Sequence, residues 1–163
     1  MSATVRPAIP GDAAALYGHW SELRRYNASI DPRVIPVPVG PGDFAAGLDS
    51  VLARRSSVAF VAESDGTLVG FISGGVETNQ PDRLPELHAT VGYLWVVTSA
   101  RRSGIGRQLV GAVTDWAAKQ DGVSHMEMAV LSADEEAATF WRSMGFSPFI
   151  ERVWAALPAK GGA

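Results

Sequence analysis

The pattern of hydrophobic and polar positions between residues 92 and 119 changes once, from an unbroken apolar run to a helical stripe. The run at 93–97 reads Tyr-Leu-Trp-Val-Val and is typical of a buried strand. A polar turn follows at 98–103, and Gly104-Ile105-Gly106 begins the stripe. Apolar residues then recur at helical spacing: Ile105, Leu109, Ala112, Val113, Trp116 and Ala117. The stretch is therefore predicted to form a strand, a turn with glycines and an amphipathic helix.

The residues before this stretch predict three strands and two helices. The strands are expected at 5–9, 58–62 and 68–76, and Asp65-Gly66 predicts a tight hairpin turn between the last two. One helix is expected to begin at Asp12 and to end near Tyr26-Asn27, and the other to begin at Asp43. Four prolines between residues 31 and 42 predict an irregular connection between these helices.

The residues after the central helix predict two more strands and one more helix. Alternation at 125–130 indicates a strand, and a helix is expected to begin at Asp134 and to stop at Gly145. A last strand is expected at 149–154. The order β-α-α-β-β-β-α-β-α-β predicts a mixed α/β (α+β) fold, and its hairpins exclude a purely parallel doubly wound sheet.

Length, charge and composition narrow the class of protein. With 163 residues, 47% of them hydrophobic, we expect one globular domain over 1–163. The net charge of −3, with no Lys/Arg run longer than two residues, argues against nucleic-acid binding. No apolar run approaches the roughly 20 residues of a membrane span, and the N-terminus has no hydrophobic signal core, so we expect a cytoplasmic protein without a membrane partner. The absence of cysteine excludes disulfides, thiolate metal sites and a cysteine nucleophile, and no metal site is predicted.

The predicted strand, turn and helix have the features of an anion site. The first N–H groups of a helix have no intrahelical partner and carry partial positive charge, and glycine lets a phosphate approach the backbone. Arg101, Arg102 and Arg107 add positive charge, which suits a ligand with several phosphates. Close strand–helix packing explains two glycines as well, whereas a dinucleotide site needs a further glycine where Leu109 stands.

Two motifs resemble one known family. Arg101-x-x-Gly104-x-Gly106 is similar to the Arg/Gln-x-x-Gly-x-Gly/Ala signature of the GNAT superfamily of N-acetyltransferases. Val130-x3-Asp134-x2-Ala137-x2-Phe140-Trp141, followed by Gly145-Phe146, resembles that family's later motif. The resemblance covers nearly the whole chain. It implies a single-domain GNAT-like fold, with a mixed, mostly antiparallel sheet flanked by about four helices.

The resemblance also implies acetyl-CoA as co-substrate. In that family the glycine turn wraps the pyrophosphate, and the preceding strand pairs with the pantetheine arm. The cofactor-binding residues implied here are Leu94, Val96, Val97, Arg101, Arg102, Ser103, Gly104, Ile105, Gly106, Arg107, Asp134 and Trp141.

Two of these residues depart from the family pattern. Asp134 stands where the family has an Asn that contacts pantetheine, and an ionised Asp cannot donate a hydrogen bond as the amide does. A helix N-cap explains Asp134 equally well. Trp141 stands where a Tyr often protonates the CoA thiolate, and an indole N–H is not a usable acid. Water, Ser132 or Tyr93 would then supply that proton.

The two positions where the family most often has its general base carry other residues in this chain. Transfer to an amine requires the neutral amine, and at the two usual places for the Glu base this chain has Thr90 and Ala129. Glu127 shares a strand face with Ala129, and His88 shares one with Thr90. Glu127 and His88 are therefore the candidate catalytic residues.

Substrate recognition in the family falls to the first two helices, their connection and the loop before the cofactor strand. Trp20 and Tyr26 are the candidate substrate-binding residues, with Asp31, Glu77 and Asp82 as candidate partners of a cationic amine. Packing or a solvated surface charge explains each of these residues equally well.

The resemblance implies acetyl transfer from acetyl-CoA to a primary amine of a small molecule or peptide, by direct attack and without a covalent enzyme intermediate. A longer acyl group is an alternative within the same chemistry. A non-catalytic acyl-CoA-binding sensor or regulatory module is the alternative from a different class. A homodimer is compatible with the resemblance, since dimers are common among such proteins.

Overall fold

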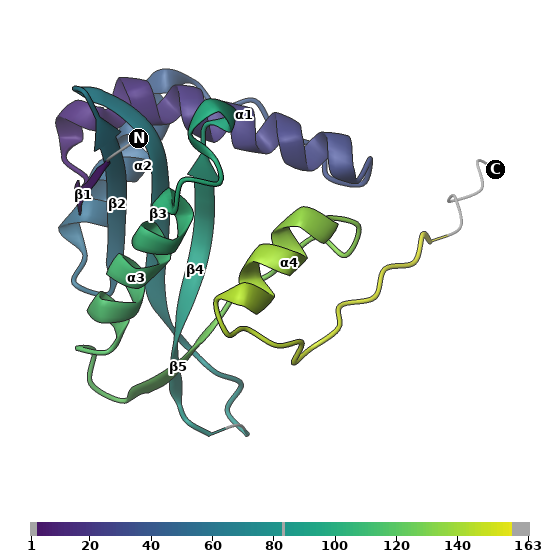
Figure 1. The fold of residues 1–163 in the computed structure, drawn as a ribbon. Helices are drawn as coiled ribbons and strands as arrows, with labels where there is room; N and C mark the ends of the chain where they lie inside the picture. The colour runs from purple at the N-terminus through teal and green to yellow at the C-terminus, as the bar shows by residue number, and fades with distance from the viewer. Residues whose placement is uncertain (1–2, 83, 158–163) are drawn as a thin grey trace.

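Five strands form one sheet in the order β1-β2-β3-β4-β5 (Figure 1). The computed structural model describes residues 3–82 and 84–157. The strands are β1 Thr4–Pro7, β2 Ser57–Ser64, β3 Thr67–Thr78, β4 Leu87–Val96 and β5 Val123–Glu127. The first four pair antiparallel in succession, and β5 alone lies parallel to its neighbour β4. The mixed, mostly antiparallel sheet is confirmed.

Four α-helices flank the sheet, as predicted. They are α1 Ala13–Ile30, α2 Pro41–Ala53, α3 Ile105–Ala117 and α4 Glu135–Ser143, with 3-10 turns η1 Pro10–Asp12 and η2 Thr98–Ala100. The helices α1 and α2 bury Leu16, Leu23 and Leu48 in one core with Trp95 of β4. On the other side, α3 buries Ile105, Leu109 and Val113 in a second core (Figure 1). The sheet therefore separates two apolar cores.

The hairpin between β2 and β3 forms at the predicted dipeptide. Asp65 and Gly66 have φ of 50° and 75°, the left-handed values that a tight hairpin turn requires. β2 and β3 pair from Ser64↔Thr67 to Ser57↔Gly75. Local turn chemistry thus sets the register of the middle of the sheet.

The strands β4 and β5 pair over only part of their length. β4 pairs with β3 as far as Val96 but with β5 only as far as Thr90, which lies opposite Glu127. Gly92 is an extra residue in β4, because Tyr93 pairs with Ser73 while Val91 pairs with Gly74. Such a bulge bends a strand and increases its twist. In the described structure, the edge of residues 91–96 that faces away from β3 therefore has no neighbouring strand.

The ends of two elements differ from the prediction, and each has a local reason. α1 continues past Asn27 to Ile30. It stops where Asp31 adopts an extended conformation, because a residue before proline, here Pro32, is disfavoured in the helical region. β5 ends at Glu127 instead of Val130. Glu127 pairs with Thr90, and after this pair β4 diverges from β5 and offers no further pairing.

The prediction of a strand at 149–154 was wrong. These residues form neither helix nor strand, and the segment leaves α4 as an extended chain (Figure 1). A strand needs a neighbour that satisfies its backbone groups, and within the described chain none lies beside this segment. Across the described residues, no helix is both long enough and apolar enough to cross a membrane.

Candidate functional site

The turn between β4 and α3 exposes backbone at the start of a helix. Gly104 is the N-cap of α3 with a φ of 89°, and a Cβ added there would meet no atom within 4 Å. Arg102 also has a positive φ of 63°, and residues 102–104 are exposed. The first N–H groups of α3 lack intrahelical partners. The turn is thus an exposed, positively polarised stretch of backbone, the kind of feature an anion site requires.

Packing fixes this turn from beneath. Ile105 is 1% exposed in the core under α3. A Cβ on Gly106 would lie 3.3 Å from ring atoms of Phe140, so this glycine lets α4 pack closely against α3. The Ser103 hydroxyl donates to the Ala100 carbonyl at 2.6 Å. Gly104 therefore serves the turn's conformation, and Gly106 serves helix packing.

The side chain of Arg101 points inward, whereas those of Arg102 and Arg107 are exposed. Arg101 Nε donates to the Val96 carbonyl at 3.1 Å, and its guanidinium carbon lies 4.7 Å from the centroid of Trp95. Its Nη1 lies 3.8 Å from the carboxylate of Glu136. Arg101 thus joins the end of β4 to the start of α4.

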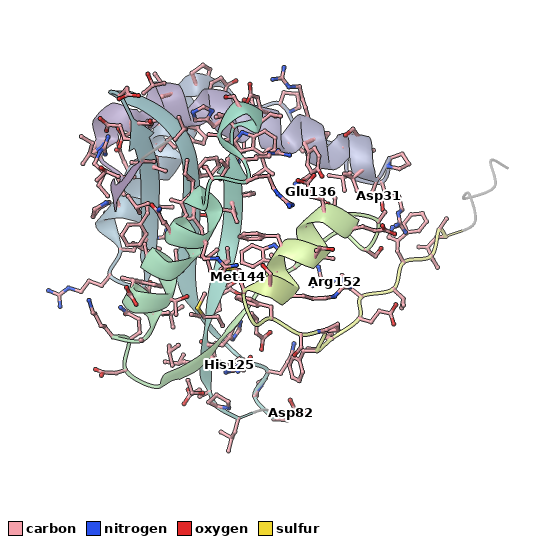
Figure 2. The ribbon with its side chains drawn as sticks, in the orientation of Figure 1. Asp31, Asp82, His125, Glu136, Met144 and Arg152 are labelled. Atoms are coloured by element: carbon pink, nitrogen blue, oxygen red, sulfur yellow. The ribbon has the colours of Figure 1, made fainter. Side chains whose placement is uncertain are left out.

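Asp134 and Tyr26 meet beside this arginine. Asp134 Oδ1 accepts from the Ala137 N–H at 2.9 Å, which confirms the predicted N-cap of α4, and from the Tyr26 hydroxyl at 3.2 Å. Burial, and then the Asp134 carboxylate, raises the pKa of Tyr26 above its usual value near 10. The phenol therefore stays protonated and donates. Figure 2 shows Asp31 and Glu136 at the ends of α1 and α4 that approach each other here.

Trp95 brings a buried donor to the same region. Its ring centroid lies 5.9 Å from that of Tyr26, and its Nε1 is buried without a hydrogen-bond partner among the described residues. Leu94 and Val96 lie on the opposite face of β4, against the core under α3, and Val97 packs against that core just after the strand. The bulged half of β4 is thus supported on both faces and open at one edge.

Trp141 is a core residue. It is 6% exposed, and its ring meets those of Phe140 and Phe146 edge-on, at 5.2 and 5.1 Å between centroids. Packing accounts for this tryptophan.

Both candidate bases lie where β4 and β5 still pair, and the structure brings them together. Glu127 Oε2 lies 4.0 Å from His88 Nε2. The buried His88 is stacked on His125 with 5.8 Å between ring centroids, and its Nδ1 has no hydrogen-bond partner among the described residues. His125 Nε2 lies 3.0 Å from Glu127 Oε1. A carboxylate between two imidazoles can accept a proton and pass it on.

Sequence reasoning missed His125. A spacing of two residues puts it on the same strand face as Glu127, and that signal was available. Its contact with His88 depends on the pairing between β4 and β5, which the sequence does not give. Figure 2 shows His125 at the end of the sheet nearest the loop that carries Asp82.

The two candidate substrate residues, Trp20 and Tyr26, contact different parts of the fold. Trp20 packs against Phe44 of α2, with 5.1 Å between centroids, and under the guanidinium of Arg24 at 4.3 Å. Tyr26 lies against Trp95 and Asp134 beside the glycine turn. Only Tyr26 is thus joined to predicted cofactor residues.

The predicted acidic partners of an amine differ in their surroundings. Asp31 is ion-paired with Arg33, whose hydrogen bonds lower the pKa of Asp31 to about 2. This carboxylate is therefore negatively charged, and the charge of Arg33 balances it. Glu77 lies opposite His88 across β3 and β4, and Asp82 is exposed on the following loop.

Two grooves lie beside the predicted substrate-recognition segments. One of about 470 Å³ lies between α1 and residues 36–40, with Tyr17 and Arg25 on its wall. The other, of about 380 Å³, is lined by the loop from Thr78 to Glu86. In the part of the chain that the structure describes, no group of three or more His, Cys, Asp or Glu is placed to hold a metal ion.

Comparison with known proteins gives a family and a set of structural neighbours. The family model described as "Acetyltransferase (GNAT) family" matches residues 21–146, more than half of the chain. No curated protein sequence matches.

Three solved structures illustrate the likeness of fold. A transcriptional regulator from Bacillus halodurans C-125 has 20% identity and a TM-score of 0.76, covering 96% of this chain and 100% of its own. Aminoglycoside acetyltransferase AAC(6')-Iy, with a CoA bisubstrate analogue, has 17% identity and a TM-score of 0.74, covering 98% and 100%. Glucosamine-6-phosphate N-acetyltransferase from Arabidopsis thaliana has 14% identity and a TM-score of 0.69, covering 97% and 100%.

The predicted fold class and the resemblance are both confirmed. An open glycine turn at the start of α3 lies beside a β4 that has separated from β5, and the family model spans both features. The chain therefore belongs to the GNAT acetyltransferase family.

Proposed function

We propose that this protein transfers an acetyl group from acetyl-CoA to a primary amine of a small molecule or peptide, by direct attack of the amine. One observation carries the proposal above all: the free edge of β4 ends at an open glycine turn, with a carboxylate–imidazole cluster on the neighbouring strand. Acetyl-CoA, when bound, supplies the thioester that the amine attacks.

The residues of the turn fit a pyrophosphate. Gly104 keeps the approach to the backbone open, because a side chain would occupy the space in front of the turn. The N–H groups from Ser103 to Gly106 would donate to phosphate oxygens, and the exposed Arg102 and Arg107 would supply positive charge. Arg101 holds the turn against β4 through its bond to Val96.

The free edge of β4 fits the pantetheine arm. Backbone N–H and C=O groups of residues 91–96 that do not pair with β3 are available to an extended, amide-containing chain, apart from the Val96 carbonyl, which accepts from Arg101. Leu94, Val96 and Val97 lie along this edge. Trp141 lies in the core behind it, and Asp134 holds the start of α4 in place.

Glu127 is the proposed general base. It takes the proton that the amine must lose, because an ammonium has no lone pair. His125 lies within hydrogen-bond distance of its carboxylate at 3.0 Å and positions it, and His88 flanks it at 4.0 Å. His125 is partly exposed and offers the proton a way to solvent, whereas His88 is buried.

Trp141, at the position where the family often has a Tyr, cannot protonate the departing thiolate. An indole donates no proton to a thiolate, and this ring is packed between Phe140 and Phe146. Water is the simplest donor, with Ser132 and Tyr93, the latter 46% exposed on β4, as the candidate hydroxyls. A CoA thiolate is a stable leaving group, so the reaction tolerates this loss.

The neighbours favour a small-molecule amine as acceptor. Two of them are named for aminoglycosides, which contain amino sugars, and for glucosamine 6-phosphate, which is one. Tyr26, which lies against Trp95 and Asp134, and Trp20, which packs against Phe44, are the proposed substrate contacts. The irregular connection at 31–40 borders the groove beside α1 through residues 36–40.

The proposal is tested by release of free CoA thiol from acetyl-CoA against amino sugars, polyamines, amino acids and N-terminal peptides. The chain has no cysteine, so thiol reagents detect only CoA. Turnover with one class of amine names the acceptor. The buried Trp141 favours a second candidate, a non-catalytic acyl-CoA sensor, which predicts tight acetyl-CoA binding without thiol release for any amine.

A further inference from the structure

The bulge in β4 lies where this strand parts from β5. Thr90 lies opposite Glu127 in the last pair of the two strands, and Gly92, the extra residue of the bulge, follows two positions later. A bulge leaves backbone groups of its strand without their regular ladder partners. The way in which those groups are satisfied therefore sets the direction in which β4 leaves β5.

One of these backbone groups is bonded by a side chain of the neighbouring strand β3. The Tyr93 N–H donates to the Ser73 hydroxyl oxygen at 3.1 Å. A Cβ added to Gly92 would lie 3.0 Å from the same oxygen, closer than such contacts normally are. The Ser73 hydroxyl thus lies against the bulge itself, and the glycine leaves room for it.

The sheet puts Ser73 on the face that carries the proposed base. Ser73 and Gly75 are two residues apart in β3 and so point to the same face. Gly75 pairs with Thr90, and Thr90 pairs with Glu127. Residues that lie opposite each other in neighbouring strands share a face. The hydroxyl that holds the bulge and the Glu127 carboxylate therefore lie on one side of the sheet.

We propose that Ser73 is a positioning residue for acetyl transfer, an inference that rests on the proposed function. Through the Tyr93 N–H it fixes the bulge, and the bulge fixes the course of the free β4 edge relative to the Glu127 carboxylate. Ser73 acts through the backbone of β4 and touches neither substrate nor cofactor in this role. Because a misplacement of reacting groups by about 1 Å can lower a rate about 100-fold, this bond bears on turnover.

Ser73→Ala tests the proposal, because it removes the acceptor of the Tyr93 N–H and leaves the backbone of β3 intact. It should lower kcat about 10- to 100-fold for whichever amine the wild type acetylates. The Kd for acetyl-CoA should stay close to that of the wild type, since the glycine turn is untouched. Ser73→Thr keeps a hydroxyl on a residue that favours strands and should restore most of the rate.

Amide exchange gives a reading that does not depend on turnover. The Tyr93 amide proton, followed by NMR, should exchange faster in Ser73→Ala than in the wild type, and slowly again in Ser73→Thr. Ser57→Ala is the matched control, because it removes a hydrogen bond of 3.0 Å from a β2 hydroxyl to the Val51 carbonyl. It should lower stability in urea by a similar amount and leave both kcat and the Tyr93 amide unchanged.

Gly92→Ala disturbs the same contact from the other strand. It should also lower kcat, and the double variant with Ser73→Ala should be no slower than the slower single variant, because both changes act on one contact. A wild-type rate in Ser73→Ala, an equal loss in Ser57→Ala, or multiplied losses in the double variant would overturn the inference alone. A wild type that acetylates no amine would instead contradict the proposed function, and this inference with it.

Discussion

Gly104 and Gly66 occupy the same left-handed backbone region, with φ of 89° and 75°, and a Cβ on either would meet no atom within 4 Å. A side chain at either position therefore costs only the left-handed strain, about 1–2 kcal/mol. The two differ in place, since Gly66 lies in the β2–β3 hairpin and Gly104 at the start of α3. They form a matched pair for testing the anion site.

Gly104→Glu should abolish acetyl-CoA binding, because it puts bulk and negative charge where the pyrophosphate is proposed to lie. Gly66→Glu carries the same strain and charge and should bind normally. Calorimetric titration with acetyl-CoA measures both. Equal affinity of the two variants for acetyl-CoA would show that the pyrophosphate does not bind at this turn.

Glu127→Gln should lower kcat/KM about 10²- to 10⁴-fold near neutral pH, the usual contribution of a general base. Acetyl-CoA affinity should be unchanged, since Glu127 lies away from the turn. The loss should shrink as pH rises, because more of the amine is then already neutral. Glu135→Gln, an exposed position at the start of α4, is the control, and a similar rate for both variants would exclude Glu127 as the base.

Among single residues, sequence predicted best those whose roles are set locally. The conformation of Gly104, the Asp65-Gly66 turn and the Asp134 cap each depend on a few neighbouring residues. The inward turn of Arg101 and the contact of His125 with Glu127 were not predicted. They depend on where β4 meets α1 and β5, which only the assembled sheet determines.

At the scale of elements, Asp134 secures the start of α4 against α1. Asp134→Ala should destabilise the fold by about 1–2 kcal/mol, because it removes the cap and the acceptor of the Tyr26 hydroxyl. Asp134→Asn retains a side-chain oxygen and should cost only a few tenths of a kcal/mol. Urea unfolding compares the two, and equal stability of the Ala and Asn variants would show that the cap contributes nothing.

Arg6 and Asp12 join β1 to the turn before α1. Two hydrogen bonds of 2.9 Å from Arg6 lower the pKa of Asp12 below its usual 3.8. A carboxyl whose pKa is lower in the folded than in the unfolded chain stabilises the fold at pH values above its unfolded pKa. This stabilisation is lost as pH falls through the lowered pKa of the folded chain. Asp12→Asn should therefore destabilise the fold by about 1–3 kcal/mol at pH 7.

The stability difference between the wild type and Asp12→Asn should shrink as pH falls below about 4, because the Asp12 carboxyl of the unfolded chain then binds a proton more readily than the ion-paired carboxyl of the folded chain. Asp49→Asn, on an exposed part of α2, should change stability little at either pH. Urea unfolding across this range gives the comparison. A difference that stays constant with pH would show that the ion pair does not stabilise the fold.

For the whole molecule, hydrophobic periodicity predicted the mixed sheet and its helices, because each period reflects local burial. It failed at residues 149–154, whose apolar residues predicted a strand. A strand forms only against a partner, and none of the described strands lies beside this segment.

The measurement that tests the account most directly follows free CoA thiol and acetylated amine in the same reaction, by a thiol reagent and by mass spectrometry. The account predicts that both products accumulate in equal amounts, in the wild type and in Gly66→Glu, and that neither accumulates in Gly104→Glu. Thiol release without an acetylated amine, or equal activity of Gly104→Glu, would contradict acetyl transfer at this site.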